Sequence, residues 1–485
     1  MSFIAFILCC IFVVWLLKKD SEVSPGLSKA LWIPSTWYLY SATRQVSTWL
    51  VRAQLIEGGG GTVESGNIID RNFLTVLIVM ALVVLHKRRI NWQQSIKNNS
   101  WLFAFFLFML VSIVWSDFPF VSLKRWIRTV GTVLMALVVL SEADPYEAIH
   151  AIIKRVVYVV IPFSFMLVKW YPVFGVVFGR WSGTPTYAGA TRTKNTLGEV
   201  CVLGLFLILW TMIAKRQGRA VGAVGNKLGV TLVFLFFIVY LMKGPPGHAS
   251  YSASSIVMFF VGVGAFYILN RLKDRLARLG RLVAYAFVGV GVLALVMNVL
   301  DISFMSIIAP ALGRKANLTD RADLIWAVLL PIAWRNPVLG GGFGSFWITP
   351  VPNLTLDVNE AHNGYLDVFL ELGIVGLILL VPVFLMYFRK ARNELAHDFN
   401  WAAFRLSYLV MFLVHNWTET TLLRNSELLW NLFVLFMVAH PDEWTGRNVE
   451  KDIPAEKASS QQEASSRARP GKTPVAALDH ATGIA

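Results

Sequence analysis

The stretch "EAHNGYLDVFLELGIVGLILL", residues 360–380, begins with a polar patch and continues without a break into an apolar run. Glu360, His362 and Asn363 come first, and Asp367 and Glu371 fall within the first turns that follow. An apolar run of this kind predicts a membrane-spanning helix. Ionisable residues at membrane depth usually face a cavity or a partner, so the stretch places a candidate site at a helix mouth.

The rest of the chain has the composition of a membrane protein. It has 485 residues, of which 56% are hydrophobic and only 15% charged. Repeated apolar stretches predict an all-α fold, a polytopic transmembrane bundle of about 12 helices. We expect these segments near residues 3–17, 70–86, 101–116, 127–141, 152–169, 197–214, 229–243, 255–270, 282–300, 366–388, 402–416 and 427–440.

The distribution of basic residues predicts the topology. Lys and Arg are dense in one alternating set of loops, namely 86–99, 141–155, 214–227, 271–281 and 389–400. The long stretch 301–365 on the other side has only Arg314, Lys315, Arg321 and Arg335. The first set is therefore expected in the cytoplasm, together with both termini. Lys18 and Lys19 violate this pattern.

Three domains are expected along the chain. Residues 1–100 hold N-terminal membrane helices and a Trp- and Tyr-rich segment, 31–50, which we expect in the outer interface. Residues 101–445 form the main membrane domain, with a long outward loop at about 301–365 that contains short helices. The polar tail 446–485 is expected to be disordered and cytoplasmic. The net charge of +15 is spread between apolar segments, so no nucleic-acid partner is expected.

The outward loops contain the candidate site residues. Arg321 begins a short amphipathic helix expected at about 322–335, and glycines cluster at 340–344. His362 is either a solvated residue or a proton-transfer group held at a helix mouth. Asp367 and Glu371 share one helix face, and we weigh structural pairing above catalysis for them.

A second outward loop, 170–196, offers cations before a membrane helix. Arg192 and Lys194 are either interfacial anchors or an anion site at the helix start. Glu419 and Arg424 in the last outward loop have the same ambiguity. The sequence shows no clustered His, Cys or carboxylate pattern of the kind that holds a divalent cation, so no metal and no cofactor are expected. A phosphate would then be bound by arginine and lysine.

These motifs together resemble the bacterial O-antigen ligase and polysaccharide polymerase superfamily. "AHNGYLDVFLELGIVGLIL" is similar to its signature, in which His-Asn opens a helix and Gly-x-x-Gly follows, here Gly373 and Gly376. "DRADLIWAVLLPIAWRNPVLGGGFGSFW", "WSDFPFVSL" and "TRTKNTLG" are similar to other landmarks of the family. The resemblance spans roughly residues 100–440.

The resemblance implies a metal-independent, inverting glycosyltransferase of the inner membrane. Its donor would be a glycan on undecaprenyl pyrophosphate at the periplasmic face, and its acceptor a second glycan or the lipid A core. By position, Arg321 would contact the pyrophosphate, His362 would activate the acceptor hydroxyl, and Arg192 or Lys194 would supply a second phosphate contact. The implied supporting residues are Asn363, Asn195, Asp367, Glu371, Glu419 and Arg424.

Two other functions are considered. The chain could be a transporter or flippase of a lipid-linked or anionic solute, although we find no internal repeat of the kind that transporters show. It could instead be a scaffold within a complex of polysaccharide assembly proteins. Between polymerase and ligase, "TRTKNTLG" favours the polymerase.

Overall fold

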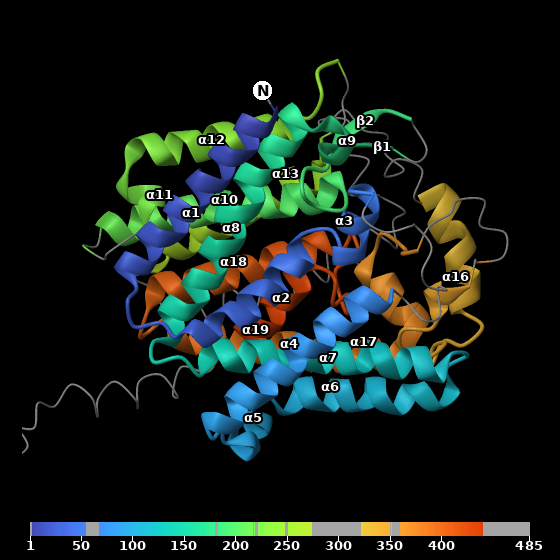
Figure 1. Ribbon diagram of the computed structural model, residues 1–485. Helices are drawn as coiled ribbons and strands as arrows, with labels where there is room; N and C mark the ends of the chain where they lie inside the picture. Colours follow the sequence, from blue (N-terminus) through green and yellow to red (C-terminus); the bar gives the residue numbers. More distant parts are fainter. Residues whose placement is uncertain are drawn as a thin grey trace, which may run out of the picture. The chain divides into compact units, whose positions relative to one another are not determined.

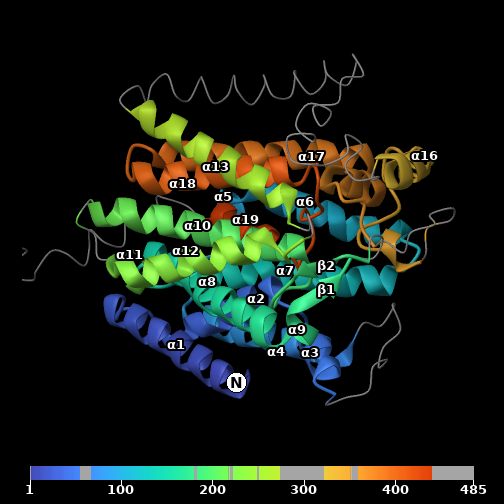
Figure 2. The ribbon, with the colours of Figure 1, turned by 90° about the horizontal axis from the view of Figure 1, so that it is seen from above.

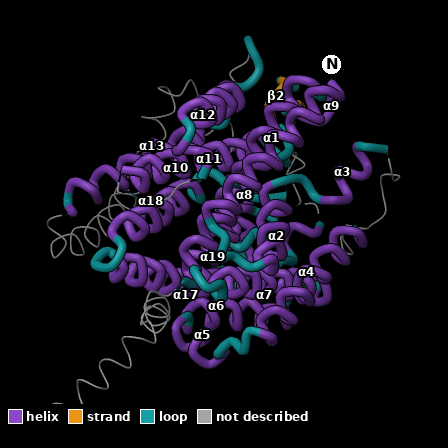
Figure 3. The backbone as a smooth tube through the Cα atoms, turned by 60° about the vertical axis from the view of Figure 1, so that its left-hand side comes forward, coloured by secondary structure: helices purple, strands orange, loops and turns teal. Residues whose placement is uncertain are grey.

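The computed structural model describes residues 2–54, 67–179, 183–216, 218, 222–247, 251–273, 322–349, 351 and 359–439. Within these ranges nearly all regular structure is helical (Figure 1 and Figure 3). The exception is one pair of short strands, β1 (Val176–Phe178) and β2 (Pro185–Tyr187), which lie antiparallel. The predicted all-α fold class is confirmed.

Eleven of the twelve predicted membrane segments contain a helix at the expected place: α1 (Ser2–Val23), α4 (Ile68–Lys87), α6 (Ser100–Val111), α7 (Pro119–Leu140), α8 (Pro145–Trp170), α10 (Lys194–Arg216), α12 (Leu228–Lys243), α13 (Ala253–Arg271), α17 (Gly364–Glu394), α18 (Phe399–His415) and α19 (Leu428–Val438). The twelfth segment, 282–300, and the tail 446–485 lie outside the described residues. Among the described helices, six are long and apolar enough to cross a membrane, or seven if the bent pair Trp92–Asn98 and Ser100–Trp115 is one span. The polytopic membrane fold is confirmed, and the count of twelve stays a prediction.

Shorter helices connect these segments. They are η1 (Lys29–Leu31), α2 (Trp32–Ala42), α3 (Val46–Arg52), α5 (Trp92–Asn98), η2 (Ser112–Trp115), α9 (Pro172–Gly175), α11 (Ala223–Asn226), η4 (Ala322–Trp326), α16 (Ala327–Ala333) and η5 (Phe346–Ile348). The last three belong to the predicted outward loop, which thus contains short helices as expected.

The connecting loops gather at two ends of the bundle. At one end Arg88 pairs with Glu142 at 2.6 Å, and Lys390 donates a hydrogen bond to Asn99 at 2.6 Å. These residues come from loops 86–99 and 141–155 and from the end of α17. We call this the Glu142 end. Loops that the charge pattern assigns to one side therefore do meet.

The opposite end collects the loops that contain the candidate site. Arg44, after α2, donates to the backbone oxygen of Gly189 at 2.8 Å. Asn195, in the first turn of α10, donates to Glu419 at 2.8 Å. We call this the Glu419 end.

The direction of α1 corrects one expectation. Asp20, near the C-terminal end of α1, pairs with Lys154 at 2.7 Å, and Phe6 packs against Phe163 further along α8. The two helices are therefore antiparallel, and α1 runs toward the Glu142 end. Its first residues therefore lie toward the Glu419 end. The tail 446–485 lies outside the described residues, so the prediction that both termini are cytoplasmic stays a prediction. The apparent violation by Lys18 and Lys19 disappears, because they lie with the other basic loops.

The Trp- and Tyr-rich segment 31–50 is also corrected. It contains α2, which passes between the two ends, since Ser28 before it donates to Glu142 and Arg44 after it contacts Gly189. Most side chains of α2 are buried in the bundle, although Trp32 is exposed. Trp37, for example, donates to Asn431 of α19 at 2.8 Å. Hydrogen bonds to Asn431 satisfy the polar atoms of Trp37 and Tyr38, which would otherwise favour the headgroup region.

Burial shows where the core lies. Every residue of α19 is buried. By contrast α1, α4 and α12 expose large apolar side chains, including Phe3, Val76 and Phe236. Figure 2 shows α1 and α4 on one side of the bundle and α13 and α18 on the other. Apolar surface on peripheral helices is the arrangement expected for contact with lipid.

The helix α17 is broken in its middle, and the break organises the site. Gly373 has φ +62° and ψ −163°, which divides α17 into residues 364–372 and 374–394. The segment 337–342 inserts at this point. The N–H groups of Gly341 and Gly342 donate to the carbonyls of Leu370 and Glu371, each at 2.9 Å.

The second half of α17 is capped by the same segment. The N–H of Ile374 donates to Pro337 at 2.8 Å, and that of Val375 donates to Val338 at 3.2 Å. The first N–H groups of a helix have no partner within that helix, and here the inserted segment supplies their acceptors inside the bundle. The Gly-x-x-Gly and Pro-x-x-Gly motifs are therefore two halves of one interlocked structure.

Candidate functional site

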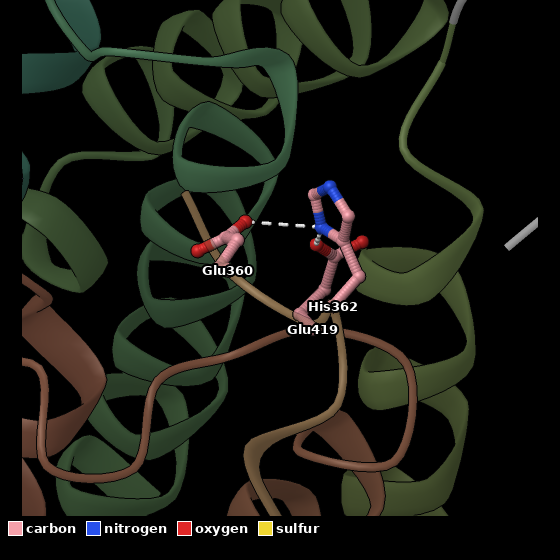
Figure 4. A group of neighbouring side chains, drawn as sticks. All are labelled: Glu360, His362 and Glu419. Carbon is pink, nitrogen blue, oxygen red and sulfur yellow. Dashed lines mark hydrogen bonds and ion pairs between the residues drawn. The ribbon is translucent and has the colours of Figure 1, made fainter. Parts of the chain in front are cut away.

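Three polar side chains meet at the mouth of α17. His362 Nδ1 lies 3.0 Å from a carboxylate oxygen of Glu360 and 3.4 Å from one of Glu419 (Figure 4). Glu360 and His362 precede α17, whereas Glu419 lies in the loop between α18 and α19. Glu419 is buried, and the other two are half-buried. We call these residues the His362 cluster.

The local sequence fixes His362 in place. Its φ of +50° is in the left-handed region, which costs a residue other than glycine about 1 kcal/mol or more. Asn363 immediately after it is the N-cap of α17, where its side chain accepts two backbone N–H groups of the first turn. The N–H of Asn363 donates to Thr420 at 3.1 Å, and that of Gly364 donates to the carbonyl of Asn416 at 2.8 Å. The imidazole is thereby tied to the Glu419 loop.

Glu419 is held from its other side. Its second carboxylate oxygen accepts from Asn195 at 2.8 Å and from Ser254 at 3.3 Å. These donors come from the starts of α10 and α13. The carboxylate is therefore oriented with one oxygen toward α10 and the other toward His362. Asn195, a predicted supporting residue, lies at the site.

The carboxylates determine the tautomer of the imidazole. An ionised carboxylate only accepts hydrogen bonds, so Nδ1 must carry the proton that faces Glu360 and Glu419. Burial alone would raise the pKa of Glu360, but His362 at 3.0 Å outweighs this effect and the pKa lies below its usual value. The other nitrogen, Nε2, then has a lone pair, and Figure 4 shows it pointing away from both carboxylates. This is the geometry of a general base.

The two acids inside α17 have well-defined partners. Asp367 pairs with Arg424 at 3.1 Å and accepts from the indole N–H of Trp347 at 2.9 Å. Glu371 accepts from the N–H of Gly344 at 3.0 Å, just after the segment 337–342 that inserts at the helix break. These contacts hold the glycine-rich loop against α17.

Arg424 connects this pair to the cluster. It donates to the backbone oxygen of Asn359, next to Glu360, at 3.2 Å. Burial lowers the pKa of Arg424, but Asp367, Glu371 and Glu360 outweigh burial and raise it. A cation therefore stays beside the His362 cluster.

Two of the three predicted phosphate-binding residues, Arg192 and Lys194, lie at the same end. Arg192 donates to the carbonyl of Ser426 at 2.6 Å and pairs with Glu427 at 2.7 Å. Lys194 begins α10 and borders a small recess with Tyr187 and Tyr251. Arg321 lies outside the described residues, so its predicted contact with phosphate stays a prediction.

Sequence reasoning missed the convergence of the three residues. The ligand atoms of Glu360, His362 and Glu419 all lie within 4.8 Å of one another, an arrangement that can hold a metal ion. The expectation that His and carboxylate side chains do not cluster is therefore wrong for the folded protein, because Glu419 comes from a loop that is distant in the sequence. The donor set suits either a small metal site or a hydrogen-bonded base. The only signal in the sequence was the Glu-x-His spacing.

An apolar cavity of about 280 Å³ lies beside the cluster. It is lined by Trp326, Leu330, Asn363, Tyr365, Leu366, Phe369, Leu377 and Trp417. Asn363 directly follows His362, so the cavity reaches the start of α17. A site that is mostly apolar with few polar groups is typical of pockets for small or lipid-like ligands.

Comparison with known proteins agrees with these observations. Residues 248–381 match the family model of the O-antigen ligase. The chain is 24% identical over 315 residues to the exopolysaccharide production protein ExoQ of Rhizobium meliloti, which covers 61% of this chain and 66% of ExoQ. It is 24% identical over 312 residues to a Rickettsia typhi protein whose name proposes a polysaccharide ligase, covering 57% of this chain and 75% of that protein. The matched region contains Glu360, His362 and the break in α17.

Proposed function

We propose that this chain is a membrane glycosyltransferase for cell-envelope polysaccharide, because residues 248–381 match the family model of the O-antigen ligase. Its donor is a glycan linked to undecaprenyl pyrophosphate, and it transfers this glycan to a second glycan or to the lipid A core. We place the protein in the bacterial inner membrane, with the Glu419 end in the periplasm. The observation that supports this most strongly is the His362 cluster, where two carboxylates hold one imidazole at the mouth of a membrane helix.

The proposed reaction joins the acceptor oxygen to the anomeric carbon. His362 Nε2 takes the proton of the acceptor hydroxyl while the bond between the anomeric carbon and the diphosphate oxygen breaks. Glu360 and Glu419 stabilise the resulting imidazolium, and attack on the face opposite to the diphosphate inverts the configuration. Such a base typically contributes ~10²–10⁴-fold to the rate.

The leaving diphosphate carries the developing negative charge. Arg192 lies at the same end of the bundle as the cluster, and Arg321 is proposed from the resemblance to share this role. Fixed cations in a poorly hydrated site are often the largest contribution to catalysis. The apolar cavity beside Asn363 suits the first part of a lipid tail. No nucleotide and no cofactor are needed, because the diphosphate already activates the sugar.

A polymerase is our first choice within this class. The exopolysaccharide production protein among the relatives is in keeping with that choice, although the ligase family model leaves a ligase open. A transporter of lipid-linked glycan is the alternative function, which the broken helix α17 alone would also suit. A transporter has no need of an oriented base, and the His362 cluster therefore favours the enzyme.

The test is a deletion strain complemented with wild-type protein or with His362→Ala. A polymerase predicts that single lipid-linked repeats accumulate at the periplasmic face, whereas a ligase predicts full-length lipid-linked polymer and bare lipid A core. The variant should reproduce the deletion phenotype at normal abundance in the membrane. Donor that accumulates on the cytoplasmic face instead would contradict the enzyme and indicate a transporter.

A further inference from the structure

Three arginines at the Glu419 end, Arg44, Arg128 and Arg192, have buried N–H groups without a hydrogen-bond partner among the described residues. Nε and Nη2 of Arg128 on α7 have no hydrogen-bond partner among the described residues, and neither does Nη1 of Arg192. A guanidinium has only donors, and each buried donor without an acceptor costs about 1–3 kcal/mol. Such groups need an explanation, and an anion that supplies acceptors is one.

The side chains of Arg128 and Arg192 are neighbours although they are far apart in the sequence. The charge of Arg192 acts directly on Arg128. The loop before α19 connects them: Asn425 donates to Thr129, next to Arg128, at 2.7 Å, and Ser426 accepts from Arg192 at 2.6 Å. The guanidinium of Arg128 also lies 5.4 Å from the ring centre of Tyr40.

Buried cations at the Glu142 end are neutralised differently. Arg405 pairs with Glu394, and Lys154 lies 2.7 Å from Asp20 and 2.7 Å from Glu147. Within the described residues, Arg128 has no carboxylate at ion-pair distance. Arg192 pairs with Glu427 at 2.7 Å, so the charge without a carboxylate partner is that of Arg128. This charge and the unused donors of both arginines favour an anion with several oxygens, and the planar fork of arginine binds phosphate oxygens in pairs.

We propose that Arg128 and Arg192 together bind a diphosphate, with Arg128 as a substrate-contacting residue. The inference rests on the proposed function and adds Arg128 to the cations named there, Arg192 and Arg321. Its position fits the chemistry. Arg192 lies just before α10, three residues before Asn195, whose side chain donates to Glu419 and so connects to His362. The diphosphate would thus lie close to the base without touching it.

The experiment measures binding to purified full-length protein in detergent. The probes are a polyprenyl diphosphate in mixed micelles and inorganic diphosphate in solution, each titrated by calorimetry. The variant is Arg128→Gln, with Arg128→Lys as a second variant that keeps the charge. The matched control is Arg155→Gln, because Arg155 also lies over an aromatic ring of α2, that of Trp32 at 4.3 Å, but near Glu142. Gel filtration and thermal unfolding verify that each variant is folded.

We expect Arg128→Gln to weaken binding of the polyprenyl diphosphate by about 10- to 100-fold. Arg128→Lys should lose less, and Arg155→Gln should bind within about twofold of the wild type. If Arg128→Gln weakens the binding of inorganic diphosphate but not that of the polyprenyl diphosphate, Arg128 binds an anion but does not bind the donor headgroup. If a folded Arg128→Gln binds both probes as the wild type does, the inference is overturned. If the wild type binds neither probe, the proposed function fails as well.

Discussion

The substitution Gly373→Ala tests the interlocked break in α17. The backbone of Gly373, at φ +62° and ψ −163°, lies in a region used almost only by glycine, and forcing another residue there costs about 1–3 kcal/mol. An added Cβ would lie 2.3 Å from the carbonyl oxygen of Val338, a backbone atom that cannot move aside, and such overpacking costs a further ~1–3 kcal/mol. The two hydrogen bonds from Ile374 and Val375 are then also weakened, at about 0.5–1.5 kcal/mol each.

These contributions total roughly 3–9 kcal/mol of unfolding free energy, a large share of the 5–15 kcal/mol that is typical of folded proteins. The assay is unfolding of the purified protein in detergent, followed by tryptophan fluorescence. The control is Gly264→Ala in α13, where an added Cβ meets nothing within 4 Å among the described residues. That change should stabilise by about 0.4–1 kcal/mol. If Gly373→Ala unfolds like Gly264→Ala, the described break in α17 is wrong.

Further predictions concern the chemistry and the pH dependence of the His362 cluster. His362→Ala and Arg321→Ala should each abolish transfer with membrane abundance near normal, and wild-type glycan output from either variant would remove that residue from the mechanism. Glu419→Gln should lower turnover by roughly 10²-fold in a reconstituted assay, because the imidazole loses its orienting carboxylate; unchanged turnover would refute that role. His362 lowers the pKa of the Glu360 carboxyl despite burial. The ionised carboxylate therefore stabilises the folded protein at any pH above the pKa that Glu360 has in the unfolded chain. This stabilisation is lost as pH falls through the lower pKa that Glu360 has in the folded protein. Glu360→Gln should therefore melt lower than the wild type at neutral pH and match it in acid, and equal melting at neutral pH would count against the contact. Transfer should survive EDTA, whereas loss that a divalent metal restores would make the His362 cluster a metal site.

Much of the fold follows from hydropathy and charge alone. Long apolar runs locate α10 to within three residues, whereas α8 begins seven residues before its predicted start and α17 ends six residues after its predicted end. The alternation of basic loops identifies which loops meet. The polar start of α17 was visible too, because His362 and Asn363 directly precede an apolar run. These features are local in the sequence, and for that reason sequence reasoning finds them.

The errors have physical causes. The helix α2 was expected at the interface because Trp and Tyr favour headgroups, but Trp37 finds its acceptor in Asn431 inside the bundle. The His362 cluster was missed because Glu419 comes from another loop. The break in α17 was missed because hydropathy carries no information about the φ of Gly373. Non-local pairing and backbone conformation decide each of these features, and neither is encoded in a periodic pattern.

The most direct measurement is reconstitution of the purified protein in vesicles with a defined oligosaccharide on undecaprenyl pyrophosphate, followed by mass analysis of the products. We predict a lengthened or transferred glycan together with free undecaprenyl pyrophosphate for the wild type, and neither product for His362→Ala. Donor that crosses the vesicle membrane chemically unchanged, or transfer that persists without His362, would contradict the account.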